Sequence, residues 1–289
     1  MKQRVLTAAA LLVLLALVVW QIYTPVFIAV IAIFSAIAAG EIMRCAKVSN
    51  KFLLVVGVIA AFIVPLFSSE SIFEPIIPTY TYLKFMTAVP KSAYVIVVVI
   101  AYFLAMLKDY EHTKFEDVAI TIVASLLVPS GFAMFGVLRD TTGYGNQIGI
   151  YLIFFGLITA LGTDVGAQLG GMKFGKTKMS PKISPKKTIE GAVCGIIFGL
   201  ILNAVAILLY NKLSDFGLTT KQITILLAAE PFIAFLGMMG DLTASVLKRN
   251  FDVKDFGKIF PGHGGVMDRF DSSLFTIPLT FVVSIFLVG

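Results

Sequence analysis

Charged residues are scarce in this chain: they make up 14% of its 289 residues, while 58% are hydrophobic. Soluble globular domains average about 25% charged residues, so this composition excludes an ordinary soluble fold. We therefore expect a single integral membrane domain over residues 1–289. Within it, residues 1–140 hold only hydrophobic spans, and residues 141–289 carry both charged motifs.

Histidine and cysteine are also scarce, which excludes several kinds of site. With only His112 and His263 present, a histidine-rich metal site is excluded. Cys45 and Cys194 form no zinc motif and no disulfide framework, so we expect two buried free thiols. The sequence also has no internal repeat.

Long apolar runs fill most of the chain, and each is close to the roughly 20 residues that cross a bilayer. They cover residues 5–22, 25–43, 52–67, 92–107, 118–138, 147–170, 189–210, 222–247 and 272–288. The runs are continuous, so the sequence predicts an all-α polytopic helix bundle with about nine transmembrane helices. The N-terminus resembles a signal peptide, but its apolar character continues to Gly40, and we expect a retained first span.

Basic residues gather on one side of this topology. With nine spans, the N-terminus and the even-numbered loops share a side that holds 18 of the 23 basic residues. The positive-inside rule then predicts a multi-pass protein of the cytoplasmic membrane, with the N-terminus and both charged motifs in the cytoplasm. The net charge of +6 is thus expected to face membrane lipid and small anions, with no nucleic acid as partner.

The first charged motif, residues 163–191, combines glycines and lysines after Asp164. Ser184 and Pro185 have the pattern of an N-cap and first turn, so we expect them to begin the helix of the next span. Lysines beside a helix N-terminus attract anions, because free amides and the helix dipole add to their charge. The candidate phosphate-binding residues are Lys176, Lys178, Ser184, Lys186, Lys187 and Thr188. Attraction to lipid headgroups is the alternative interpretation.

The second charged motif begins at Asp241, at the end of the span 222–247. Asp241, Ser245 and Lys248 share a helix face at i, i+4 and i+7. From residue 245 to 272 the chain holds four aspartates, five cations and a Pro-Gly-His-Gly-Gly turn. Such charge beside membrane spans is costly to place, which indicates a functional use.

Asp268 and Asp271 have the i, i+3 spacing of one helix face, and with Ser272 we expect them to open the last span. Two carboxylates at the ends of adjacent helices suit Mg²⁺, which takes one or two carboxylates together with water and phosphate oxygens. The alternative is that Asp241, Asp268 and Asp271 form structural ion pairs. Their partners would then be Lys248, Arg249 and Arg269.

Four short stretches within 27 residues now resemble a known signature. They are Ser245-Val-Leu-Lys248-Arg249, Lys254-Asp255-x-Gly257, Pro261-Gly-His263-Gly264-Gly265 and Asp268-Arg269-x-Asp271. This pattern resembles the signature of phosphatidate cytidylyltransferases (CDP-diacylglycerol synthases), and residues 183–191 resemble the second landmark of that family. Where the family often has an aromatic pair, this chain has Gln168 and Leu169.

The resemblance implies that CTP and phosphatidic acid react to CDP-diacylglycerol and pyrophosphate, with Mg²⁺ and an optional second cation, in phospholipid biosynthesis. It makes residues 141–289 the catalytic half, with its active site at the cytoplasmic face. The implied metal ligands are Asp241 and Asp268, with Asp271 as a third or outer partner. The implied phosphate-neutralising residues are Lys248, Arg249 and Arg269. Further implied substrate contacts are Asp164, Ser245, Lys254, Asp255 and His263, beside the first motif.

Two other functions stay open at this point. A CTP-dependent lipid-alcohol kinase would share the spans and phosphate-binding loops but would transfer the γ-phosphate. A membrane transporter of an anionic substrate would place charges near the membrane midplane, whereas these charges lie near one face. Small residues in the spans 147–170 and 189–210 are suited to a helix interface, which makes a homo-oligomer a further expectation.

Overall fold

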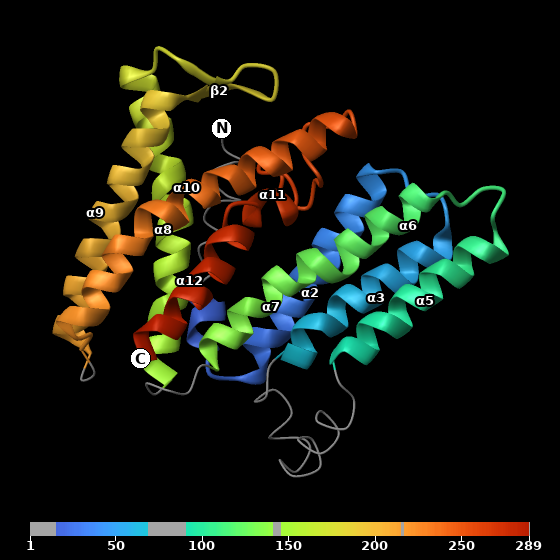
Figure 1. Cartoon of the computed structure of the whole chain (residues 1–289), viewed down its shortest axis with the longest axis horizontal. Helices are drawn as coiled ribbons and strands as arrows, with labels where there is room; N and C mark the ends of the chain where they lie inside the picture. The colour runs from blue at the N-terminus through green and yellow to red at the C-terminus, as the bar shows by residue number, and fades with distance from the viewer. Residues whose placement is uncertain (1–15, 69–90, 141–145, 215–216, 289) are drawn as a thin grey trace, which may run out of the picture. The chain divides into compact units, whose positions relative to one another are not determined.

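The computed structural model describes residues 16–68, 91–140, 146–214 and 217–288 (Figure 1). These residues are almost entirely helical, with one two-stranded hairpin. Seven of the described helices are long and apolar enough to cross a membrane. The prediction of an all-α polytopic membrane protein is therefore confirmed. The expected first span, residues 5–22, lies largely outside the described residues.

The other expected spans coincide with helices, because each apolar run can satisfy its backbone only as a helix. The helices are α2 (Pro25–Cys45), α3 (Lys51–Ser68), α5 (Lys91–Lys108), α6 (Phe115–Ile122), η1 (Val123–Leu127), α7 (Val128–Arg139), α8 (Asn146–Phe174), α9 (Ile189–Leu213), α10 (Thr220–Asn250) and α12 (Ser273–Val288). The single span expected at 118–138 is thus a run of α6, η1 and α7. The π turn η1 precedes Pro129, which lacks the backbone N–H that a regular helix needs.

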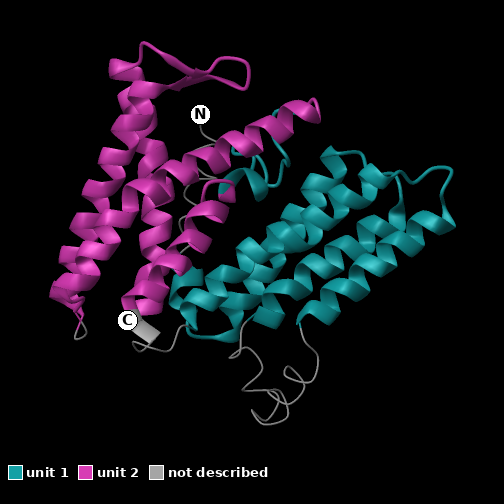
Figure 2. Ribbon diagram, viewed as in Figure 1, with its two compact units in different colours: residues 1–140, 253–269 teal, residues 141–252, 270–289 magenta. Residues whose placement is uncertain are grey.

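The helices group into two compact units, each described here by itself (Figure 2). Unit 1 takes residues 1–140 and 253–269, and unit 2 takes residues 141–252 and 270–289. The second charged motif is therefore divided: its glycine-rich turn, here residues 253–266, belongs to unit 1, and helices α10 and α12 before and after it belong to unit 2.

Unit 1 packs α3 and α7 against α2. Its core includes Ile28, Met43, Leu53 and Phe132, each fully buried. The hydroxyl of Ser35 in α2 donates to the carbonyl of Ala61 in α3 at 2.8 Å. Such pairing is required because lipid offers no partner to a polar group.

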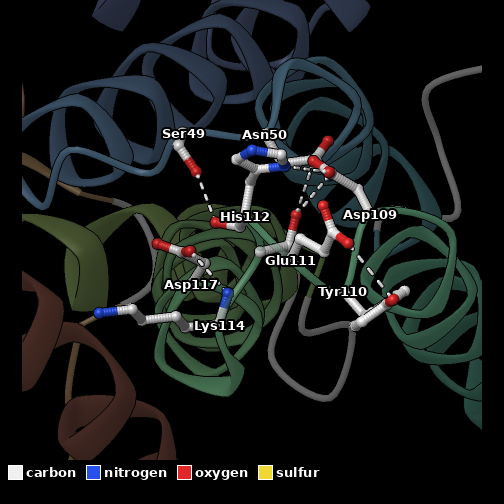
Figure 3. A network of polar contacts seen from close by, with 9 residues as sticks. Ser49, Asn50, Asp109, Tyr110, Glu111, His112, Lys114 and Asp117 are labelled. Carbon is white, nitrogen blue, oxygen red and sulfur yellow. Dashed lines mark hydrogen bonds and ion pairs between the residues drawn. The ribbon is translucent and has the colours of Figure 1, made fainter.

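One end of unit 1 is held by contacts between the α2–α3 and α5–α6 connections (Figure 3). Ser49 Oγ donates to the carbonyl of His112 at 3.3 Å, and Asn50 Nδ2 donates to Thr113 Oγ1 at 2.8 Å. His112 Nδ1 lies 3.0 Å from Asp109 Oδ1 on the exposed surface. Both connections thus lie at the same end of unit 1, as an alternating topology predicts.

In unit 2, glycines allow α8 and α9 to pack closely as an antiparallel pair. A Cβ on Gly195 would stand 2.6 Å from the carbonyl oxygen of Thr163, and one on Gly191 would stand 2.7 Å from that of Ala167. The small residues expected at a helix interface therefore serve a contact within the chain. The homo-oligomer remains a prediction. Helices α10 and α12 pack against this pair and against each other.

Candidate active site

The lysine-rich segment of unit 2 forms a hairpin between α8 and α9. Strand β1 (Lys178–Ser180) pairs antiparallel with β2 (Ser184–Thr188), with Lys178 opposite Thr188 and Ser180 opposite Ser184. The side chains of four lysines on this hairpin are exposed: Lys176, Lys178, Lys182 and Lys186. The hairpin thus presents cations to the solvent beside the first turn of α9.

Thr188, and not Ser184, caps α9. The Thr188 hydroxyl accepts a hydrogen bond from Gly191 N at 3.1 Å, and the helix begins at Ile189. The prediction that Ser184 and Pro185 begin this helix is wrong, because pairing with β1 holds Ser184–Thr188 as a strand. The Glu190 carboxylate also accepts the N–H groups of Lys176 and Thr177, which fixes the hairpin to the helix.

Lys187 differs from the other lysines because it forms a salt bridge with Asp241 of α10. The two side chains are 28% and 23% exposed, so solvent screens this pair less than a surface pair. This contact joins the two charged motifs within unit 2. The sequence predicted a phosphate-binding Lys187 and a metal-binding Asp241 but did not predict that they pair.

Three carboxylates of unit 2 influence one another. Ser272 Oγ donates to Asp164 Oδ2 at 3.3 Å, linking the start of α12 to α8. Burial is the main cause that raises the pKa of Asp271 to about 7, and the charge of Asp241 is the next. The charges of Lys248 and Asp164 act in opposite directions on the same pKa, the former lowering it and the latter raising it. Asp271 therefore lies in a negative, partly desolvated environment.

The donor types of this cluster suit Mg²⁺. In the part of the chain that the structure describes, no three His, Cys, Asp or Glu side chains stand close enough to hold one metal ion. Mg²⁺ commonly takes only one or two protein carboxylates, with water and phosphate oxygens completing its shell. The residues thus fit an ion whose coordination shell is completed by oxygens of the substrate. The metal itself remains a prediction.

In unit 1, Asp268 organises the glycine-rich turn. Its side chain is 8% exposed, and its Oδ2 accepts the N–H groups of Phe256 at 2.8 Å and Gly265 at 3.0 Å. Gly264 has a positive φ of 86°, and a Cβ there would stand 2.8 Å from Asp268 Oδ2. Glycine is therefore required at this position on two grounds.

Asp268 and Asp271 do not share a helix face. Asp268 lies in the short helix α11 (Met267–Phe270), whereas α12 begins only at Ser273. The prediction that Asp268 opens the last span together with Asp271 is wrong, whereas Ser272 does begin it, since its carbonyl accepts Thr276 N at 3.1 Å. The hydrogen bonds from the turn to Asp268 hold α11 as a separate element, and Asp271 falls in the break between the helices.

Glu41 of α2 is a site residue that sequence reasoning missed. Its carboxylate is 4% exposed and accepts Val266 N at 3.1 Å and Met267 N at 3.0 Å. It thereby satisfies free amides at the start of α11, next to Asp268. The available signal was a carboxylate inside an apolar run, which is costly unless it has partners.

The remaining predicted residues divide between the units. Ser245, Lys248 and Arg249 lie on α10 in unit 2. Lys254, Asp255 and Arg269 are exposed in unit 1. His263 lies on the glycine-rich turn, and its buried Nδ1 has no hydrogen-bond partner among the described residues. Cys45 is a half-buried thiol, and its Sγ donates to the carbonyl of Phe256 at 3.1 Å.

These elements define a multi-pass membrane protein with a lysine-rich hairpin and clustered carboxylates among its helices. The chain belongs to the cytidylyltransferase family, whose model matches residues 2–287. The resemblance seen in the sequence is thereby confirmed.

Parts of the chain are also similar to curated proteins named phosphatidate cytidylyltransferase. The one from Bacillus subtilis is 55% identical over 56 residues, which is 19% of this chain and 21% of the relative. The one from Staphylococcus haemolyticus is 46% identical over 71 residues, 25% of this chain and 26% of the relative. The aligned stretches thus span about a fifth to a quarter of each relative.

Proposed function

We propose that this protein is a phosphatidate cytidylyltransferase, which transfers CMP from CTP to phosphatidic acid. The family and the names of the similar proteins support this reaction. The observation that carries the proposal is the salt bridge between Lys187 and Asp241. This salt bridge joins the lysine-rich hairpin, which suits a polyphosphate, to a carboxylate that suits a metal ion.

In the proposed reaction, an oxygen of the lipid phosphate attacks the α-phosphorus of CTP. A new P–O–P bond forms, the bond between the α-phosphorus and the bridging oxygen breaks, and pyrophosphate leaves with the electron pair. The products are CDP-diacylglycerol and pyrophosphate. No strong general base is required, because a phosphate monoester with a second pKa of about 6 is already anionic near neutral pH.

The main barrier is repulsion between two anions, so the protein's part is electrostatic. Lys176, Lys178 and Lys186 of the hairpin bind CTP phosphates, and Lys187 does so beside Asp241. Thr188 acts indirectly, by fixing the hairpin to α9. When bound, Mg²⁺, alone or with a second cation, would neutralise charge on the α-phosphate and on pyrophosphate. In unit 2 its proposed ligands are Asp241 and Asp271, whereas Asp268, a ligand predicted from the sequence, belongs to unit 1, where it holds the glycine-rich turn.

The proposed location is the cytoplasmic membrane, with the N-terminus and the catalytic loops in the cytoplasm. The distribution of basic residues supports this orientation. The contacts of unit 1 agree with it, since Cys45 at the end of α2 bonds to Phe256 of the glycine-rich turn. The basic α2–α3 connection and this turn therefore lie at the same end of unit 1.

Position-specific labelling of CTP tests the reaction. With purified protein, phosphatidic acid and Mg²⁺, label at the α-phosphate should move into the lipid, and label at the γ-phosphate should leave as pyrophosphate. A lipid-alcohol kinase would instead transfer the γ-label to a lipid alcohol and release CDP. An anion transporter would move substrate into vesicles without transferring either label. Either of these results would overturn the proposal.

A further inference from the structure

Unit 1 contains a cavity of about 450 Å³ between α2, α3 and the glycine-rich turn. Aliphatic and aromatic side chains form its walls, and cations stand at one end. The residues that matter here are Ile33, Ile37, Val58, Phe62, Arg44 and Lys258.

The apolar and charged linings are separated along α2. Ile33, Ile37 and Arg44 follow one another at i, i+4 and i+11, so they lie along one helix face with the cation nearest the helix end. At 1.5 Å per residue, Ile33 and Arg44 are about 16 Å apart along the axis. The hydrocarbon of one leaflet is about 15 Å thick, or half of about 30 Å. The distance from Ile33 to the cation at the helix end thus matches the depth of one leaflet.

The apolar wall is also partly open at its surface. Ile33 is 47% exposed and Phe62 is 37% exposed, although both line the cavity. In a membrane helix bundle, such side chains face lipid. An acyl chain can therefore enter the cavity from the side.

The cations at the end of the cavity make no direct side-chain contact, although the charge of Arg44 acts on the neighbouring Glu41. Arg44 and Lys258 are exposed, and neither side chain forms a hydrogen bond or salt bridge with another described residue. Glu41 lines the same cavity, but both of its oxygens already accept backbone N–H groups. An anionic headgroup would complement the positive charge of Arg44 and Lys258 at this end of the cavity. The aliphatic walls suit acyl chains better than the hydroxylated ribose of CTP.

The cavity adjoins the turn that carries Asp268. Lys258 lies two residues after Phe256, whose N–H donates to Asp268 Oδ2 at 2.8 Å and whose side chain lines the cavity. A headgroup held by Lys258 is therefore attached to the same short turn as this candidate catalytic acid.

We propose that this cavity is the phosphatidic acid site. The lipid phosphate lies at Arg44 and Lys258, and one acyl chain follows Ile33, Ile37, Val58 and Phe62. This assignment rests on the proposed function, because it names where that reaction takes its lipid. It differs from a general affinity for the bilayer, because it requires these walls and these two cations.

A matched pair of substitutions on α3 tests the apolar wall. Val58→Trp fills the cavity, whereas Val55→Trp, one turn earlier, adds the same side chain to an exposed position outside the lining. Direct binding of radiolabelled dioleoyl phosphatidic acid is measured in detergent without CTP, followed by KM for each substrate in mixed micelles. Val58→Trp should weaken lipid binding and raise KM for the lipid by about tenfold or more, with KM for CTP unchanged and Val55→Trp like the wild type.

A second pair tests the cations. The double variant Arg44→Gln, Lys258→Gln should weaken phosphatidic acid binding by about tenfold or more, while Lys51→Gln, an exposed lysine outside the lining, should not. Ile37→Trp blocks the cavity from α2 and replaces Val58→Trp if that variant does not fold. If wild type turns over but Val58→Trp and Ile37→Trp match Val55→Trp, the assignment is wrong. If wild type binds the lipid in this cavity but releases no pyrophosphate, the proposed function fails and the cavity assignment stands.

Discussion

Lys187 in β2 and Asp241 in α10 form a salt bridge across 54 residues of sequence. It connects a hairpin that presents exposed lysines to the residue of α10 that acts, together with Asp164, on the pKa of Asp271. In the proposed reaction, Lys187 holds Asp241 in position before substrate arrives and can contact phosphate afterwards.

Lys187→Met should therefore reduce turnover by about 10²-fold, the usual effect of losing one electrostatic contact at a reacting phosphate or oxyanion. The measurement is kcat and KM for CTP in mixed micelles. Lys182→Met is the matched control, because Lys182 is exposed at the hairpin turn and has no assigned role. Equal turnover in both variants would refute the assignment of Lys187.

Glu41→Gln should destabilise the glycine-rich turn, because an amide nitrogen replaces one of the two oxygens that accept Val266 N and Met267 N. Leaving a buried donor without an acceptor costs about 1–3 kcal/mol. A lower thermal midpoint in detergent and a loss of activity are both expected. Glu111→Gln, on an exposed loop of the same unit, should leave both unchanged. A Glu41→Gln midpoint equal to that of Glu111→Gln would show that this carboxylate does not hold the turn.

Gly195→Val should separate α8 from α9, because its Cβ would stand 2.6 Å from the carbonyl oxygen of Thr163. Overpacking of a tight interface costs about 1–3 kcal/mol or more. The hairpin depends on both helices, so activity should fall together with the thermal midpoint. Val193→Leu, at an exposed position of α9, is the control. A stable and active Gly195→Val variant would contradict the close packing.

Asp271 should make stability depend on pH when divalent cations are removed with a chelator. Its pKa is raised from 3.8 to about 7 in the folded protein, so folding favours the protonated form. This contribution is fully present below pH 3.8 and is lost as the pH rises through about 7. The thermal midpoint of the wild type should therefore fall over this window relative to Asp271→Asn. The exposed Asp252→Asn variant is the control and should show the same pH dependence as the wild type. If the thermal midpoints of the wild type and of Asp271→Asn change with pH in parallel, the raised pKa of Asp271 is ruled out.

The helices were predictable from the sequence because apolar runs of span length have few other structures available in lipid. The grouping of lysines on one segment and of Asp241, Ser245 and Lys248 on one helix was likewise visible. Local pattern failed at Ser184–Thr188, where strand pairing with β1 overrode the helix-start pattern of Ser184 and Pro185.

Long-range contacts were beyond the sequence. Glu41 and Val266 are separated by 225 residues, and nothing in either segment indicates the other. The break between Asp268 and Asp271 was hidden for a similar reason. It arises from backbone N–H groups of Phe256 and Gly265 that hold Asp268, and a regular i, i+3 spacing does not reveal them.

The most direct test of the proposed cytidylyl transfer is pyrophosphate release by the purified full-length protein supplied with CTP, phosphatidic acid and Mg²⁺. Asp241→Asn and Asp268→Asn are measured beside it, with Asp252→Asn as the control. We expect pyrophosphate release to require all three components and to be retained in the control. In each of the other two variants it should fall by about 10²-fold or more. Full release without Mg²⁺, or undiminished release in both Asp241→Asn and Asp268→Asn, would contradict the proposed transfer.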